Sequence, residues 1–324
     1  MIYCDRTNRI NFMIGFTLFL RKKIILFLLS LWVVATITFF LMHSIPGDPF
    51  TTDQALPKEI LESMQRHYGL DKPLFIQYIQ YMKGLLTFSL GPSLKYQDRQ
   101  VIDVIQEGFP VSCYLGLEAL SISLTLGLIL GAISAIFHGR WQDKALMVFS
   151  VLGLSIPSFI LATFLQYLFA MKLSLLPVAR WGSFSHTILP ALSLAALPTA
   201  FIARLSRTSM IEVLGQDYIQ TAKAKGLSTI LIITRHVLRN ALLPVLAYLG
   251  PLAASILTGG FAVEKIFGIP GLGQWFVISI ANRDYTVIMG LTLFYSAFLL
   301  TAVLLMDIIS SFLDPRISLQ PDEF

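Results

Sequence analysis

Six long apolar stretches separated by polar segments dominate the pattern of this chain of 324 residues. A helix needs about 20 mostly apolar residues to cross the hydrocarbon core of a bilayer. Each stretch is close to that length or longer, so the pattern predicts an all-α membrane protein with six transmembrane helices. The six stretches are Ile24–Met42, Cys113–Phe137, Ala145–Ala170, Ile188–Leu205, Ala241–Phe261 and Val287–Leu313.

The first apolar stretch follows Arg21, Lys22 and Lys23, an arrangement that also begins secretory signal peptides. Its apolar run is longer than the core of a signal peptide, and the "HSIPGDP" that follows offers no small-residue cleavage site. We therefore expect an N-terminal tail at residues 1–23 and an uncleaved first transmembrane helix at residues 24–45.

Lysine and arginine are concentrated in alternate loops, and basic loops of membrane proteins face the cytoplasm. If both termini are cytoplasmic, the inner segments hold fourteen of these residues and the short outer loops hold four. We therefore expect an external segment at 46–112, a five-helix core at 113–313 with a cytoplasmic loop at 206–239, and a cytoplasmic C-terminal tail at 314–324.

The external segment contains amphipathic patterns rather than a featureless loop. "LPKEILESMQRHYG" has Pro57 at a helix start and Gly69 as a stop, and "KPLFIQYIQYMKG" and "QVIDVIQEG" repeat the amphipathic style. These patterns predict a small helical cap on the external side. The helices either dock on the spans with a specific role or simply join the first two spans.

The composition agrees with a membrane protein and excludes several other classes. Charged residues make up 13% of the chain and the mean hydropathy is +0.72, whereas soluble domains carry about 25% charged residues. The net charge of +5 lies mainly in the cytoplasmic loops, so we expect contact with membrane lipid and no nucleic-acid partner. Cys4 and Cys113 lie on different segments and predict neither a disulfide nor a metal site.

The common catalytic and nucleotide-binding motifs are absent. No G-x-x-x-x-G-K-[ST] occurs, so we expect no ATP binding through a P-loop, and the five histidines form no H-E-x-x-H motif. G-x-S-x-G is also missing, which removes one signature of serine hydrolases but not every intramembrane enzyme. We expect no catalytic, cofactor-binding or metal-binding residues, and therefore a chain that is not an enzyme.

Two acidic residues lie well inside the predicted spans, Glu118 and Asp307. Carboxylates are costly in a bilayer, so each is a candidate functional residue. Asp307 is near the cytoplasmic end of its span, where hydration or pairing with a loop arginine also explains it. Glu118 either lines a pathway or makes a structural hydrogen bond, and an ion-coupled secondary transporter remains an alternative. The chain lacks the two related halves of many such transporters, which favours a second subunit.

A polar insert, "DYIQTAKAKGL" at residues 217–227, separates the fourth and fifth spans. Asp217 is a good N-cap, and Gly226 is placed as a C′ residue that can take positive φ. A short helix between them places four residues on one side, namely Tyr218, Ile219, Ala222 and, more loosely, Lys225.

The predicted helix has only two turns, so it is too short to be stable alone and must pack against something. It either lies on lipid headgroups, with Lys223 and Lys225 near anionic lipid, or inserts into a groove of a protein partner. Its apolar face of one tyrosine, one isoleucine and small alanines is weak for lipid and favours the protein groove.

Motifs along nearly the whole chain resemble those of ABC importer permeases, in the version carried by peptide and nickel importers. The insert lies in "RTSMIEVLGQDYIQTAKAKGLSTILIITRHVLRNALLPVL", which is similar to the EAA-loop region of that family. Further matching segments, in order, are "HSIPGDP", "YGLDKPLFIQY", "SIPSF", "HTILPALSLAALPTAFIARLSRTSM", "VEKIFGIPGLG", "NRDYTVIMG" and "DPRI". Their order and spacing make the resemblance specific.

The chain also departs from the general family pattern. Gln220, Thr221 and Ala222 stand where the EAA motif has Glu-Ala-Ala, a difference shared with the peptide-importer branch. Tyr114 stands where a glutamate is usual, with Glu118 one turn further on. Residues 1–12 precede the usual start of the family.

The resemblance implies a type I importer permease fold in a bacterial inner membrane. It also implies a second, homologous permease as heterodimer partner, two cytoplasmic ABC ATPases that bind the ATP, and an external solute-binding protein. The cargo would be dipeptides or oligopeptides, or alternatively nickel complexes or other small solutes.

The same resemblance implies that the helix Tyr218–Lys225 is the coupling helix, held in a cleft of the ATPase. Tyr218, Ile219 and Ala222 would supply the docked face, and Gly226 would supply the turn that sets its angle. Pro157, Pro198 and Pro244 lie in or beside spans, where a missing hydrogen bond permits either a hinge or a fixed curvature.

Overall fold

The computed structural model describes residues 2–45, 50 and 58–313, and their regular structure is helical apart from one isolated bridge between Pro92 and Gln100. Five helices are long and apolar enough to cross a membrane, and a bent helix pair makes up to six. The five are α1 (Ile2–Ser44, with its span at Leu20–Ser44), α4 (Val101–Ile136), α7 (Ser185–Leu214), α10 (Leu238–Leu257) and α13 (Tyr285–Leu313). The predicted all-α membrane fold is therefore confirmed.

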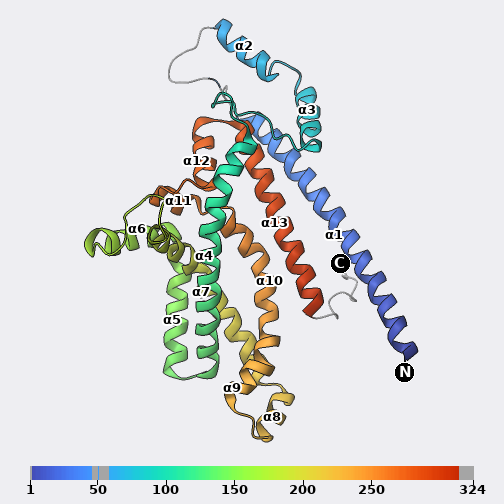
Figure 1. Ribbon diagram of the computed structural model, residues 1–324, viewed down its shortest axis with the longest axis vertical. Coiled ribbons are helices and arrows are strands. Elements are labelled where there is room, and N and C mark those ends of the chain that lie inside the picture. The colour runs from blue at the N-terminus through green and yellow to red at the C-terminus, as the bar shows by residue number, and fades with distance from the viewer. Residues whose placement is uncertain (1, 46–49, 51–57, 314–324) are drawn as a thin grey trace.

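The third predicted span, Ala145–Ala170, is not one continuous helix. It is split into α5 (Trp141–Ser155) and α6 (Ser158–Leu165), which continues as the π-helical η1 (Gln166–Lys172), and the two parts are bent by 101°. Pro157 precedes α6, and Ile156 before it is extended with φ −91° and ψ 117°. A residue before proline is pushed out of the helical region, so the chain breaks here. Figure 1 shows α6 running across the axis of α5.

Two other predicted boundaries differ from the structure. The fifth span ends at Leu257 rather than Phe261, because Gly259 with φ +109° interrupts the chain before the short helices α11 (Phe261–Phe267) and α12 (Leu272–Asn282). The predicted external helix "QVIDVIQEG" is not separate: it forms the first turns of α4, where the Gln100 amide donates to Asp103 Oδ2 at 2.9 Å.

The remaining cap helices agree with their sequence patterns. These are α2 (Lys58–Tyr68) and α3 (Leu74–Leu86), and Gly69 follows α2 with φ +68° as expected of a stop. Pro57, the predicted start of α2, lies outside the described residues. Figure 1 shows α2 at one end of the bundle and the helix α8 (Asp217–Ala224) at the other, and we name these the α2 end and the α8 end.

The centre of the bundle is the pair α4 and α7, which approach closely through small residues. A methyl group on Gly131 of α4 would lie 2.7 Å from the Ala203 carbonyl oxygen and 2.0 Å from Ser206 Oγ, both on α7. Small residues permit such backbone approach between helices in lipid, where packing replaces the hydrophobic effect. The pair therefore forms a tight seam that continues to the α8 end.

We predict that Gly131→Ala destabilises the protein by about 1–3 kcal/mol, because the added carbon meets a backbone carbonyl that cannot rotate away. Thermal unfolding in detergent measures the effect. Gly215→Ala is the matched control, since its added carbon comes no nearer than 3.4 Å to the Glu212 carbonyl oxygen and its φ is −79°. An equal loss in both variants would contradict the seam.

Candidate functional site

The polar insert forms α8 as expected, but its start differs from the prediction by one residue. Gln216 is the N-cap, with extended φ −73° and ψ 148°, and Asp217 is the first helical residue. The Gln216 side chain makes no capping hydrogen bond. The prediction of Asp217 as N-cap is therefore wrong, although its carboxylate still lies in the first turn, where it complements the helix dipole.

The C-terminal end of α8 confirms Gly226 as the predicted C′ residue with positive φ. This glycine has φ +78°, its amide donates to the Lys223 carbonyl at 2.9 Å, and the Leu227 amide donates to the Ala222 carbonyl at 3.3 Å. The two bonds form a Schellman motif, which usually needs glycine at this position. The angle at which the chain leaves α8 is thus fixed by local backbone chemistry.

The buried face of α8 packs on its own chain. Ile219 is 0% exposed and Ala222 is 7% exposed. They belong to a cluster shared with α4, α7, α10 and the segments α9 (Thr229–Ile232) and η2 (Ile233–Val237), whose other buried members are Ala135, Met210, Ile232, Val237 and Ala241. A two-turn helix needs tertiary packing, and this cluster provides it. The prediction that Ile219 and Ala222 supply a face docked on a partner is therefore wrong.

The opposite face of α8 is exposed and mostly polar. Tyr218 is 45% exposed, and its hydroxyl accepts a hydrogen bond from Asn240 Nδ2 of α10 at 2.9 Å. The other exposed residues of α8 and its C-cap are Asp217, Gln220, Thr221, Lys223, Ala224 and Lys225. We call these residues with Tyr218 the outer face of α8. It is available to a partner, whereas Ile219 and Ala222 hold the helix in place.

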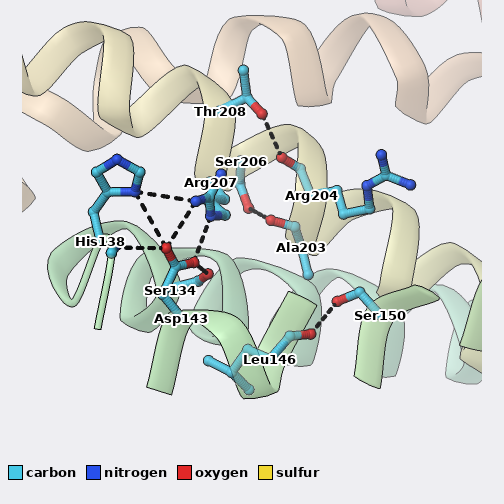
Figure 2. A network of polar contacts seen from close by, with 11 residues as sticks. Ser134, His138, Asp143, Leu146, Ser150, Ala203, Arg204, Ser206, Arg207 and Thr208 are labelled. Carbon is cyan, nitrogen blue, oxygen red and sulfur yellow. Dashed lines mark hydrogen bonds and ion pairs between the residues drawn. The ribbon is translucent and has the colours of Figure 1, made fainter. Parts of the chain in front are cut away.

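A buried ion pair lies near α8, between the α4–α5 turn and α7 (Figure 2). Asp143 is 3% exposed and accepts from both sides of the Arg207 guanidinium, with Nε at 2.7 Å and Nη2 at 2.8 Å. Ser134 Oγ donates to the same carboxylate at 2.5 Å, and the Gly139 amide donates at 2.9 Å. His138 Nδ1 completes the network, 3.2 Å from Asp143 Oδ2.

This network, which we call the Asp143 clamp, joins the end of α4 and the start of α5 to α7, the helix directly before α8. Bidentate arginine–carboxylate pairs are geometrically specific, and a buried pair is costly to break. Arg207 lies seven residues before the last residue of α7, which is about 11 Å along the helix axis. The clamp therefore connects the α4–α5 turn to the last two turns of α7, the helix that directly precedes α8.

Comparison with known proteins decides the family. Residues 127–319 match the family described as binding-protein-dependent transport system inner membrane component, and residues 16–116 match the N-terminal part of such membrane components. The chain belongs to this family of inner membrane permeases. The chain is therefore a transport subunit, and α8 is a short polar helix of that subunit. Subunits of this family transport and do not hydrolyse ATP themselves.

Relatives of the permease cover nearly its whole length. It is 51% identical over 290 residues to the dipeptide transport system permease protein of Bacillus subtilis, covering 90% of this chain and 94% of that protein. It is 42% identical over 301 residues to the oligopeptide transport system permease protein of Haemophilus influenzae, covering 92% and 98%. The inward facing MetNI methionine ABC transporter is similar in fold, with a TM-score of 0.51 and 16% identity over 67% of this chain and 97% of that one.

The other candidate residues of the permease do not gather at α8. Glu118 is half-buried in the middle of α4, and its Oε2 is buried without a hydrogen-bond partner among the described residues. Tyr114 is 50% exposed, one turn nearer the α2 end, with its ring 5.8 Å from that of Trp181. Pro244 lies inside α10, and Pro157 marks the bend before α6. Both readings of Glu118, a pathway residue or a structural one, stay predictions.

Sequence reasoning missed a buried carboxylate, Glu264 of α11, which is 0% exposed. Ser112 Oγ of α4 donates to its Oε1 at 2.8 Å, and the Gln274 amide of α12 donates to its Oε2 at 3.2 Å. Asp307 was singled out instead, and it pairs with Lys23 of α1 at 3.0 Å. Pairing of Asp307 with a loop arginine was one expected explanation. The observed partner is a lysine of α1 instead. Gly271 and Gly273 of "GIPGLG" were the available signal, because a side chain at either position would meet the Glu264 carboxylate.

Proposed function

We propose that this permease forms half of the translocation pathway of an ATP-driven peptide importer, with α8 as its coupling helix. The observation that carries the proposal is the construction of α8. It is a two-turn helix with a glycine-fixed end, anchored by Ile219 and Ala222, and it presents an exposed polar face at the end of the central helix pair. A helix used only to connect two spans needs no such exposed and rigidly held face.

The proposed assembly contains this chain, a second homologous permease, two ABC ATPases and an external solute-binding protein. The matched family is binding-protein-dependent, which supports the external protein. The chain has no P-loop of its own, so ATP is bound by the partner subunits. Surrounding membrane lipid covers the exposed apolar side chains of the spans.

In the proposed orientation the α8 end and both termini face the cytoplasm. The bias of lysine and arginine supports this arrangement, since basic residues near the ends of spans stay inside. The outer face of α8 then meets the ATPases, and α2 with α3 meets the external solution or the outer membrane surface.

The proposed mechanism links the ATPases to the pathway through α8, α7 and the Asp143 clamp. Closure of the ATPase dimer on ATP moves α8, and Arg207 on α7 transmits this movement to Asp143 and the α4–α5 turn. The spans then change between inward-open and outward-open arrangements. Because such coupling is reciprocal, delivery of cargo at the external side also changes ATP affinity at the ATPases.

Dipeptides or oligopeptides are the proposed cargo, because the relatives of 51% and 42% identity are named for dipeptide and oligopeptide transport. Nickel complexes or other small solutes are the alternative cargo. An ion-coupled secondary transporter has weaker support, since Asp307 is paired with Lys23. Glu264, the buried carboxylate of α11 described above, accepts hydrogen bonds from Ser112 and from the Gln274 amide, as expected of a structural group.

Reconstitution tests the proposal. The permease, its co-purifying subunits and the external binding protein are assembled in proteoliposomes, and uptake of a radiolabelled dipeptide is measured with internal ATP. We expect uptake that requires ATP and is abolished when the P-loop lysine of the ATPases is replaced. Uptake driven by a proton or sodium gradient without ATP would overturn the importer, and ATP-driven uptake of a nickel complex alone would change only the cargo.

A further inference from the structure

Helix α3 of the cap carries an apolar stripe that the described part of the chain leaves largely uncovered. Phe75, Ile79, Met82 and Leu86 follow one another at spacings of four, three and four residues, which places them along one side of the helix. Phe75 is 71% exposed and Leu86 is 82% exposed. The adjoining side of α3 carries Tyr78 and Tyr81, whose rings pack on Phe40 and Phe39 of α1.

The end of α3 adds a still more exposed apolar residue in a costly conformation. The Phe88 amide donates to the Leu85 carbonyl at 3.1 Å and the Ser89 amide donates to the Gly84 carbonyl at 2.9 Å, so α3 ends in a Schellman motif. Phe88 occupies the position usually held by glycine, with φ +56°, and its side chain is 91% exposed. The positive φ is costly for a residue with a Cβ in any solvent, and the exposed ring is unfavourable in water in particular.

The contacts of α3 place it at the depth of the membrane rather than above it. Tyr78 Oη lies 2.9 Å from Thr36 Oγ1, and Gln77 Oε1 lies 3.0 Å from His43 Nε2. Both partners belong to the span Leu20–Ser44 of α1. Thr36 is eight residues before the end of that span, which corresponds to about 12 Å along the helix. Figure 1 shows α3 beside this end of α1, whereas α2 lies beyond it.

An apolar groove opens beside the stripe, between α3 and the spans α1 and α13. It has a volume of about 740 Å³ and is lined almost wholly by apolar side chains. Those that define it are Trp32 and Ala35 of α1, Met82 and Leu86 of α3, and Leu293 and Ala297 of α13. Two of its walls are transmembrane helices, so the groove is continuous with the lipid-facing surface of the spans.

We propose that α3 is a membrane-embedded element, with its stripe and Phe88 inserted among acyl chains of the adjacent leaflet and one phospholipid chain lying in the groove. In the orientation given above this is the outer leaflet. Amphipathic helices lie in this way at the boundary between headgroups and acyl chains. The exposed rings that water disfavours are then in an apolar solvent, and the aromatic contacts with α1 hold α3 at that depth. The proposal does not depend on the cargo or on ATP coupling.

Spin-label accessibility tests this placement in the full-length chain with its co-purifying subunits, in nanodiscs of phosphatidylethanolamine and phosphatidylglycerol. Cys4 and Cys113 are replaced by serine, and a nitroxide is attached at Phe88→Cys or, separately, at Phe75→Cys. Collisions with oxygen, which concentrates in lipid, are compared with collisions with a water-soluble nickel chelate. We expect oxygen collisions to exceed nickel collisions several-fold at both sites.

Two reference labels calibrate the result. Leu28→Cys on α1, 60% exposed in the middle of a span, reports lipid, and Ser63→Cys on the exposed side of α2 reports water. Two sites on α3 keep the test valid if one label disturbs the turn at Phe88. Nickel-dominated collisions at both sites, as at Ser63, would overturn the proposal in favour of a water-exposed cap. Low collisions with both reagents would also overturn it, because a protein subunit would then cover α3.

Discussion

Replacing Arg207 with methionine is expected to destabilise the permease by about 3–5 kcal/mol, because it leaves the Asp143 carboxylate buried without its countercharge. The side chain of Asp143 is 5% exposed, whereas that of Arg207 is 19% exposed. The reverse change, Asp143→Asn, should therefore cost less, since the freed guanidinium lies nearer to solvent. This asymmetry, measured by thermal or denaturant unfolding in detergent, distinguishes the clamp from a general packing defect.

The double variant completes the test of the clamp. If Asp143 and Arg207 interact directly, the combined variant loses less stability than the two single losses together, with a coupling of about 0.5–3 kcal/mol. Arg204→Met is the matched control on the same helix, because Arg204 is exposed. Its effect should stay within about 0.5 kcal/mol. Additive losses, or an equal loss at Arg204, would contradict the clamp.

The proposed mechanism adds a functional consequence. In the reconstituted importer, the Arg207 variant should hydrolyse more ATP per molecule of cargo transported, because movement of α8 is no longer passed on faithfully to the α4–α5 turn. The ratio is measured at a temperature where the variant remains folded, so that stability and coupling are separated. An unchanged ratio would leave the clamp as a purely structural feature.

The features that could be predicted from sequence are those fixed by local chemistry. The apolar stretches give the spans, and Gly226 gives the end of α8, because a Schellman motif requires only nearby backbone groups and a residue that tolerates positive φ. The break at Pro157 follows from the same kind of rule. Its angle of 101° does not, because the direction of α6 is set by packing against α7 and α11.

The features that could not be predicted depend on contacts between distant segments. Asp143 and Arg207 are 64 residues apart, and neither has a sequence motif that indicates the other. The buried side of α8 was equally hidden, because Ile219 and Ala222 suit a partner's groove and an intrachain cluster alike. Only the position of α8 relative to α7 and α10 decides between them.

Replacing Ala224 with tryptophan is expected to leave the permease folded while lowering ATPase binding and ATP-driven uptake at least about tenfold. Ala224 and Gln220 lie one turn apart on the outer face of α8, away from Ile219 and Ala222. A bulky ring there should change the stability of the permease alone by no more than about 0.5 kcal/mol, as usual for an exposed site. A close-fitting cleft of the ATPase has no room for the indole ring. A loss of 1.4 kcal/mol of binding free energy lowers the affinity for the ATPase tenfold.

Two comparisons make this prediction specific to the outer face. Ile219→Ala removes the buried anchor and should destabilise the permease itself by about 2–5 kcal/mol, which is visible in unfolding without any ATPase. Lys144→Trp places the same bulk on an exposed site of α5 at the same end of the bundle, and should leave ATPase binding intact. Co-purification of the ATPases and uptake in proteoliposomes are measured for all three variants.

The pattern of results separates docking from folding. Normal stability with lost ATPase binding, seen for Ala224→Trp alone, identifies the outer face as the surface that meets the ATPase. Lost stability in the same variant would place Ala224 in the fold of the permease instead. Wild-type binding and uptake would show that the ATPase engages the permease elsewhere, since an added indole cannot be accommodated unnoticed at a close-packed interface.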